Sequence, residues 1–215
     1  RPGMATIRSR GTGSLSKRGK AQRKSSQTAK EGIAPLLAPL QALQNLVAQF
    51  KHQGVIIGGI AASLLGTPRF TADLDAVFLL SVDDIPRLLQ EAARQGIEPR
   101  IPDAEAFARK NRVLLLRHTT SGTDIDLSLG TLPFEYEMVE RSSLVNVGAL
   151  QLRLPTPEDL IIMKAIAHRP KDLADIEAIA ASHPDLDEER IRDWVEQFGE
   201  ALDLPELWDE ISKYL

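Results

Sequence analysis

Residues 55–80 read V-I-I-G-G-I-A-A-S-L-L-G-T-P-R-F-T-A-D-L-D-A-V-F-L-L, and this stretch decides the predicted fold. It predicts a short apolar strand over 55–57, a turn at Gly58 and Gly59, a small-residue helix over 60–65 and, after a loop, a second strand that carries acids. Glycine amides at the start of a helix bind anions well, because no side chain blocks their N–H groups. The first half of the stretch therefore predicts a phosphate site.

The second half of the stretch places two carboxylates side by side. Asp73 and Asp75 are separated by one apolar residue, and alternate residues of a strand share one face of the sheet. Neighbouring carboxylates repel each other unless a cation lies between them, and Mg²⁺ held by carboxylates and substrate phosphates is the usual occupant. A phosphate site beside a metal site is the layout that phosphoryl or nucleotidyl transfer requires.

The order of these features resembles the nucleotidyltransferase superfamily with a polymerase-beta-like fold. Ile57-Gly58-Gly59 is followed by thirteen residues and then by the Asp-x-Asp that begins at Asp73, and a third acid, Asp126, lies between apolar residues in a later strand pattern. The resemblance implies an α/β (α+β) fold, in which a small mixed β-sheet of about five strands has helices mainly on one face. It also implies a helical C-terminal region that closes the site.

Three segments look more narrowly like the AbiEii-type toxin nucleotidyltransferase family, the toxin half of some bacterial toxin–antitoxin pairs. They are G-G-x-A, R-F-T-A-D-L-D and K-A-I-A-x-R-P-K-D-L-A-D-I. This resemblance implies Mg²⁺-dependent transfer of a nucleoside monophosphate from an NTP to a hydroxyl of RNA, tRNA or protein, with a small molecule as a further acceptor and a cognate antitoxin as a partner. Gly59 departs from the family pattern, because many relatives use Ser there to contact a phosphate.

The resemblance also assigns the metal ligands. Asp73, Asp75 and Asp126 are expected to bind two Mg²⁺ ions, with Mn²⁺ as an alternative. Asp126 would bind only the ion that lowers the pKa of the acceptor hydroxyl. Asp124 shares a strand face with Asp126 and is either a further ligand or a solvent-exposed strand end.

The nucleotide-binding residues include several with an ordinary structural alternative. Arg69 contacts a triphosphate or is a loop arginine, and Lys164 contacts a phosphate or is a structural lysine that extends along an apolar helix face. Lys171 and Asp172 are functional residues or ordinary charges at a helix start. The predicted nucleotide-binding residues are Gly58, Gly59, Arg69, Thr71, Lys164 and Lys171, and the predicted catalytic residues are Asp73, Asp75, Asp126, Lys164 and Asp172.

The composition excludes several other classes of protein. The 215-residue chain has no cysteine, which removes disulfides, thiolate metal sites and cysteine catalysis and suits a reducing cytoplasm. No apolar run reaches the roughly 20 residues of a membrane helix, so no membrane partner is expected. The histidine spacing matches no zinc motif, and P-loop, Rossmann and serine hydrolase motifs are absent.

The charge distribution divides the chain into regions. Residues 1–30 contain nine Lys or Arg and no acid, so a basic tail at 1–32 precedes an acidic body. Such a tail is either disordered or an arm that binds nucleic acid. A nucleotidyltransferase core is expected at 33–155 and a helical C-terminal region at 156–215.

The remaining patterns predict individual elements. The apolar spacing favours a helix that begins near Pro39 and ends near Phe50, and Thr156 followed by a proline is a strong helix start. Further strands are expected at 113–117, 125–129, 144–147 and 150–154, and further helices at 81–95, 157–168, 171–182, 188–202 and 205–214.

The alternative function is a catalytically silent member of the same fold that binds nucleotides or proteins. All three acids are present, which argues against a decayed site.

Overall fold

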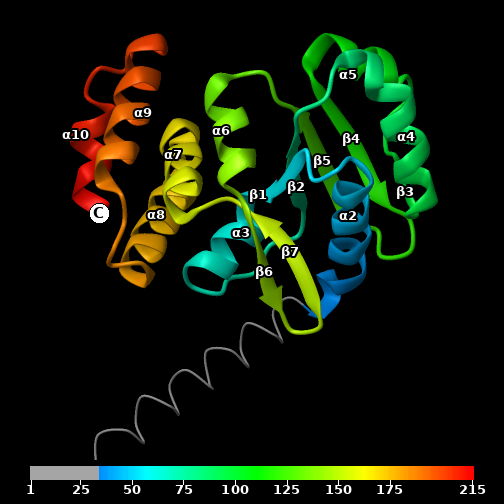
Figure 1. Ribbon diagram of the computed structural model, residues 1–215, viewed down its shortest axis with the longest axis horizontal. Helices are drawn as coiled ribbons and strands as arrows, with labels where there is room; N and C mark the ends of the chain where they lie inside the picture. The colour runs from blue at the N-terminus through cyan, green and yellow to red at the C-terminus, as the bar shows by residue number, and fades with distance from the viewer. Residues whose placement is uncertain (1–33) are drawn as a thin grey trace, which may run out of the picture.

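A five-stranded mixed β-sheet lies at the centre of the protein (Figure 1), and the computed structural model describes residues 34–215. The predicted basic tail at 1–32 lies outside the described residues. The strands are ordered β1-β2-β5-β4-β3; β2 and β5 are parallel and the other neighbours antiparallel, as expected for a small mixed sheet. They are β1 (Gly54–Ile57), β2 (Leu74–Phe78), β3 (Ile97–Pro99), β4 (Val113–His118) and β5 (Asp124–Leu129).

The two faces of the sheet have different characters, because side chains alternate along each strand. The apolar face buries leucine, isoleucine and phenylalanine side chains from β2, β4 and β5, and the other face carries the acids of β2 and β5. The buried side chains of the apolar face include Leu74, Ala76, Phe78, Leu114, Leu116, Ile125 and Leu127.

Three helices pack against strands β1, β3 and β4 of the sheet. They are α2 (Leu37–Gln49), α4 (Ile85–Arg94), which follows a short 3₁₀ turn, and α5 (Ala104–Asn111). α2 contacts β1 and α4, and α5 contacts β4 and α4. Helix α2 begins two residues before Pro39, because a proline is tolerated in the first turn, where its missing N–H would have no partner inside the helix.

The structure adds elements that the sequence did not reveal. Helices α5 and α6 (Pro133–Arg141) and the three-residue strand β3 were not predicted. Helix α3 (Gly58–Leu65) includes both glycines, whereas the sequence pattern put them in a turn before the helix. Because the glycines are helical residues, their amides lie in the first turn of α3.

A β-hairpin joins the sheet to the C-terminal helices. Strands β6 (Ser143–Val147) and β7 (Leu150–Leu154) pair antiparallel around Gly148, close to the predicted bounds. Gly148 has φ +63°, a left-handed conformation that glycine adopts without a steric penalty. The β7 strand packs against β1 and α2, so the hairpin extends the central structure.

The C-terminal region is helical, as predicted. It comprises α7 (Pro157–Ala167), α8 (Pro170–Ser182), α9 (Glu188–Ala201) and α10 (Leu207–Ile211). Thr156 Oγ1 accepts a hydrogen bond from the amide of Asp159, which confirms the predicted helix cap. Helices α7 and α8 pack against α3, which in turn contacts β2 (Figure 1).

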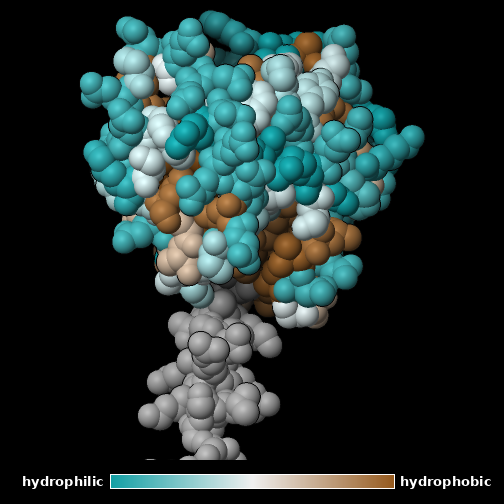
Figure 2. All heavy atoms as spheres, turned by 60° about the vertical axis from the view of Figure 1, so that its left-hand side comes forward, coloured by the Kyte–Doolittle hydropathy of each residue, from teal (hydrophilic) through white to brown (hydrophobic). Residues whose placement is uncertain are grey.

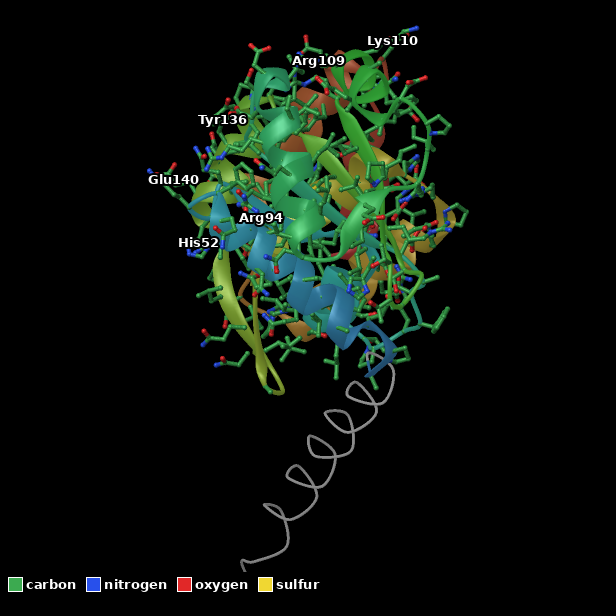
Figure 3. All side chains as sticks on the ribbon, turned by 90° about the vertical axis from the view of Figure 1, so that its right-hand side faces the viewer. His52, Arg94, Arg109, Lys110, Tyr136 and Glu140 are labelled. Carbon is green, nitrogen blue, oxygen red and sulfur yellow. The ribbon has the colours of Figure 1, made fainter. Side chains whose placement is uncertain are left out.

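The surface is mainly hydrophilic, with hydrophobic side chains gathered in the lower part of the face drawn in Figure 2. Arg109 and Lys110 on α5 point away from the protein (Figure 3). Arg109 forms salt bridges with Glu105 at 3.0 Å and Asp83 at 3.3 Å, so its charge is locally balanced. In residues 34–215 no helix is both long and apolar enough to span a membrane.

Candidate functional site

The predicted acids gather on one face of the sheet. Asp75 and Asp126 are opposite each other in the parallel pair β2–β5, and both are partly exposed. Asp73 lies one residue before β2 and is exposed, although the sequence pattern placed it within the strand. All three carboxylates therefore belong to the same end of the sheet, as the Asp-x-Asp spacing and the third acid predicted.

Asp75 has no direct counter-charge among the described residues. Burial raises the pKa of Asp75, and the negative charges of Asp73 and Asp126 raise it further. The charges of Lys164 and Lys171 lower this pKa, but neither lysine forms a salt bridge with Asp75 among residues 34–215. The ionised form of Asp75 is therefore destabilised by burial and by its acidic neighbours, and a nearby positive charge would stabilise it.

Gly58 brings the start of α3 against this carboxylate. Its φ is +70°, and a Cβ atom at this position would overlap Oδ2 of Asp75. Only glycine fits here, both for its backbone conformation and for the close approach of Asp75. The first turn of α3 lies beside Asp75, because Gly58 approaches that carboxylate closely. No side chain caps this turn, so its amide N–H groups can donate hydrogen bonds to a ligand.

Gly59 lies under the loop that connects α3 to β2. A Cβ atom at Gly59 would be 2.7 Å from Oγ1 of Thr71 and 3.4 Å from Nη2 of Arg69. The hydroxyl of Thr71 also donates a hydrogen bond to Oδ1 of Asp73 at 3.3 Å. Thr71 therefore provides a hydroxyl next to the helix start, close to the position of the serine that Gly59 replaces.

Arg69 is held in place by its backbone and its side chain. The hydroxyl of Ser63 accepts from the Arg69 amide at 3.1 Å and donates to the Arg69 carbonyl at 2.8 Å. The guanidinium makes two hydrogen bonds of 2.7 Å to the carboxylate of Asp175 on α8. Those hydrogen bonds raise the pKa of Arg69. Arg69 is thus near Gly59 but already paired with Asp175.

Lys164 is at the buried centre of a group of charges, which we name the helical ion cluster: Arg69, Lys164, Arg169, Asp172 and Asp175. The Nζ atom of Lys164 is 3.0 Å from Oδ1 of Asp172 and 2.9 Å from Oδ2 of Asp175. Arg169 adds a salt bridge of 2.5 Å to Asp172. Lys164 and Asp175 are each 5% exposed and Asp172 is fully buried, whereas the side chains of Arg69 and Arg169 are 35% and 57% exposed. The two arginines therefore pair the buried carboxylates from the solvent side.

The cluster keeps both of its carboxylates ionised. Burial acts to raise the pKa of Asp172, but hydrogen bonds from Arg169 and Lys164 outweigh it and hold the pKa below its usual value. Burial acts in the same direction on Asp175, and hydrogen bonds from Arg69 and Lys164 again lower the pKa. The salt-bridging interpretation of Asp172 is therefore the one that the geometry favours.

The positions of the two predicted nucleotide-binding lysines differ. The sequence left Lys164 as a phosphate contact or a structural lysine, and in the structure its ammonium is buried between two carboxylates. Lys171 is exposed in the first turn of α8, forms no salt bridge among residues 34–215, and lies close enough for its charge to act on Asp75. Lys171 is accordingly the more accessible of the two to an anionic ligand.

Two arginines near the acids were missed by the sequence reasoning. Nη1 of Arg100, which follows β3, is 2.7 Å from Oδ1 of Asp126. Arg117 on β4 is opposite Asp124, and its Nε is 2.7 Å from Oδ1 of that acid. The hydrogen bond from Arg117 lowers the pKa of Asp124, so this acid belongs to an ion pair. Period-two alternation in the β4–β5 hairpin was the available signal for the second pair.

Asp73 and Asp75 are the residues best suited to hold a metal ion. Their hard oxygen donors match the preference of Mg²⁺, which typically binds one or two carboxylates and completes its shell with phosphates and water. Within residues 34–215, no three His, Cys, Asp or Glu residues form a group that could hold a metal ion, so the predicted set Asp73, Asp75 and Asp126 is not such a group. Two carboxylates that share Mg²⁺ with phosphates and water are compatible with this finding.

The comparisons with known proteins agree with this architecture. A family model described as "Nucleotidyltransferase of unknown function (DUF6036)" matches residues 36–200. The solution structure of the antibiotic-resistance factor ANT(2'')-Ia is similar with a TM-score of 0.53 and 14% identity, over 79% of this chain and 94% of that one, which shows a shared fold. An antigenic nucleotidyltransferase-like protein from Paracoccidioides brasiliensis gives a TM-score of 0.47 and 16% identity, over 86% and 94%. No curated protein matches the sequence.

Proposed function

This chain belongs to the family of nucleotidyltransferases of unknown function (DUF6036), and we propose that it transfers a nucleoside monophosphate from an NTP to an acceptor hydroxyl with Mg²⁺ as cofactor. The observation that carries the proposal is the position of Asp75. Its carboxylate has no direct counter-ion among the described residues and lies against the uncapped first turn of α3. A divalent cation held by Asp75 would supply positive charge there, and a phosphate bound to that cation would accept hydrogen bonds from the helix amides.

The residues around the helix start would bind the donor nucleotide. The amides of Gly58 and Gly59 donate to phosphate oxygens, and the exposed ammonium of Lys171 approaches from α8. Asp73 and Asp75 would hold Mg²⁺, which when bound neutralises charge on the phosphates and on the departing pyrophosphate. Thr71 orients Asp73 through its hydrogen bond.

The chemical step needs only positions and charges from the protein. The acceptor oxygen attacks the α-phosphorus, a new O–P bond forms, and the bond from the α-phosphorus to the bridging oxygen breaks, so that pyrophosphate leaves. The hydroxyl proton passes to Oδ2 of Asp126, the oxygen that Arg100 does not contact, and then to water. Preorganised charges at the helix start stabilise the transition state.

The helical ion cluster would act on this step indirectly. Lys164 and Asp172, expected from the resemblance to be catalytic, hold α7, α8 and the guanidinium of Arg69 together beside the helix start. Their contribution to transfer is then the correct placement of Arg69 and Lys171. A direct contact between Lys164 and a phosphate would first require its two carboxylate contacts to break.

The acceptor and the biological role are proposed from the sequence resemblance. The K-A-I-A-x-R-P-K-D segment supports an AbiEii-like toxin that modifies RNA, tRNA or a protein hydroxyl and is neutralised by a cognate antitoxin. A catalytically silent module of the same fold is the alternative. It predicts nucleotide or protein binding without transfer.

The direct test is transfer of label from each of the four α-labelled NTPs. The protein is incubated with Mg²⁺ or Mn²⁺ and with total cellular RNA or protein, and label in macromolecules is measured. We expect label from the wild type, none from Asp75→Asn, and near-normal label from Asp124→Asn, a matched control on the same sheet face whose partner is Arg117. Equal labelling by the wild type and Asp75→Asn would disprove the assigned site, and nucleotide binding without any labelling would support the silent module.

A further inference from the structure

Arg100 is anchored against the third acid by several contacts. Its Nη1 atom is 2.7 Å from Oδ1 of Asp126 and also donates to the carbonyl of Leu116 at 3.2 Å. Its amide donates to the carbonyl of Leu115, the residue opposite Asp126 in the β4–β5 pair. The side chain of Arg100 is 20% exposed. The guanidinium is thus a fixed part of the sheet edge and not a freely moving surface charge.

The unpaired carboxylates on the acidic face of the sheet balance the charge of one divalent ion, not of two. Asp124 and Asp126 are each paired with an arginine at 2.7 Å, and Nη1 of Arg100 also lies 3.9 Å from Oδ2 of Asp124. Asp73 and Asp75 form no salt bridge with any residue in the part of the chain that the structure describes. Two unpaired carboxylates carry two negative charges, which is the charge of one divalent cation.

We propose that the site uses one divalent metal ion, held by Asp73 and Asp75, and that the guanidinium of Arg100 takes the place of a second ion at Asp126. This inference rests on the proposed function and differs from the expectation of two ions, which is drawn from the sequence resemblance. A second divalent ion bound to Asp126 would lie next to a fixed positive charge, which repels it. The guanidinium of Arg100 also neutralises part of the negative charge of Asp126 and occupies its Oδ1 atom.

The arrangement gives Arg100 a role as a positioning residue. It holds Oδ1 of Asp126 and leaves Oδ2 without a hydrogen-bond partner among residues 34–215. Asp126 lies opposite Asp75 in the β2–β5 pair, so its carboxyl group is on the same face of the sheet as that proposed metal ligand. An acceptor hydroxyl bound there would meet a carboxylate of fixed orientation.

The test counts bound Mn²⁺ in the complex with one equivalent of a non-hydrolysable NTP analogue. Free Mn²⁺ is measured by electron paramagnetic resonance during a titration, and the analogue alone gives the reference. We expect one Mn²⁺ per wild-type complex, and a second Mn²⁺ in Arg100→Gln that binds at least tenfold more tightly than any second ion in the wild type. Arg117→Gln, which removes the 2.7 Å pair at Asp124 but leaves Arg100 at 3.9 Å from that acid, should keep a single ion.

A conservative variant separates charge from packing. Arg100→Lys keeps a positive charge near Asp126 and should still bind one ion, and it remains informative if Arg100→Gln does not fold. Two ions in the wild type, one of them lost in Asp126→Asn, would overturn the inference while leaving the proposed function in place. A single ion in folded Arg100→Gln would overturn the role of Arg100, and no nucleotide-dependent Mn²⁺ binding at all would count against the proposed function itself.

Discussion

Two pairs of aspartates within this protein have opposite electrostatic environments. Asp73 and Asp75 have no salt bridge among the described residues, and the pKa of Asp75 is raised by burial and by its acidic neighbours. Asp172 and Asp175 are more deeply buried, yet three cations surround them and their pKa values are lowered. Aspartate thus serves two purposes in this protein. The unpaired Asp73 and Asp75 favour the binding of a cation, and the paired Asp172 and Asp175 link α7, α8 and the loop that carries Arg69.

The contrast between the two acid pairs changes the interpretation of the K-A-I-A-x-R-P-K-D motif in the C-terminal region. Lys164 and Asp172 were expected to act on the nucleotide, but each is engaged by a partner inside the helical ion cluster. Breaking one buried ion pair leaves a charge without a partner, which costs more than the pair contributes when it is intact. We therefore expect substitutions in the two pairs to fail in different ways.

The largest expected effect is the loss of transfer in Asp75→Asn. The variant should lose about 10³-fold or more in kcat/KM, equivalent to roughly 4 kcal/mol, because the metal and phosphate site loses its central charge. Its melting temperature should equal or exceed that of the wild type, since one source of like-charge repulsion is removed. Transfer assays with labelled NTP and thermal melts test both parts. Transfer at the wild-type rate in Asp75→Asn would show that the unpaired acids have no functional role that distinguishes them from Asp172 and Asp175.

Lys164→Met should instead reduce stability. Removal of the ammonium leaves Asp172 and Asp175 with fewer buried counter-charges, and we expect a loss of about 3–5 kcal/mol in the free energy of unfolding. Urea denaturation measures this loss, with the exposed Lys171→Met as the control that should change by less than about 0.5 kcal/mol. If Lys164→Met is as stable as the wild type but fails in transfer, the lysine acts on the nucleotide as the sequence predicted.

The pH dependence of stability sharpens the comparison further. Because the pKa values of Asp172 and Asp175 are lower in the folded state, their stabilisation is complete above their unfolded value of about 3.9 and is lost as the pH falls through the folded values. The free energy of unfolding should therefore fall steeply in this acid range. The double variant Asp172→Asn/Asp175→Asn should start from a lower stability at neutral pH and show a shallower fall. An equally steep fall in that variant would assign the acid sensitivity to other groups.

The smallest expected effect concerns the glycine that replaces the serine of many relatives. Gly59→Ser should cost about 1 kcal/mol, because its Cβ atom would be only 2.7 Å from Oγ1 of Thr71. Thr71→Ala should make room for the serine, so the double variant should recover stability relative to the sum of the two single changes. If the losses in the free energy of unfolding of the two single variants simply add in the double variant, Thr71 does not occupy the space that a serine at position 59 would need.

Much of the fold and part of the site follow from local patterns. The alternation around Asp75, the glycines before it and the apolar residues around Asp126 predicted the central strands and their common acidic end. Thr156 predicted the start of α7. These features were accessible because spacing within one strand or one helix turn determines which side chains share a face.

The remainder depends on contacts between segments that are distant in the chain. Arg100 follows a three-residue strand that ends in proline, and nothing in its neighbourhood indicates that it meets Asp126. The burial of Lys164 depends on how α7 and α8 pack, and Asp175 approaches Arg69 across more than one hundred residues. Sequence patterns identify the charged residues but not their partners, and the partners decide which charges are left for a ligand.

The most direct measurement of the central claim is the change in melting temperature on addition of Mg²⁺ with a non-hydrolysable NTP analogue. At a concentration of 100 times Kd, a ligand that binds only the folded protein stabilises it by about 2.7 kcal/mol, which is a shift of roughly 5–10 °C for a domain of this size. We predict this shift for the wild type and for Asp124→Asn, a much smaller shift with Mg²⁺ alone, and almost none for Asp75→Asn. An equal shift in Asp75→Asn and the wild type would contradict the claim that the unpaired acids at the start of β2 bind the metal–nucleotide complex.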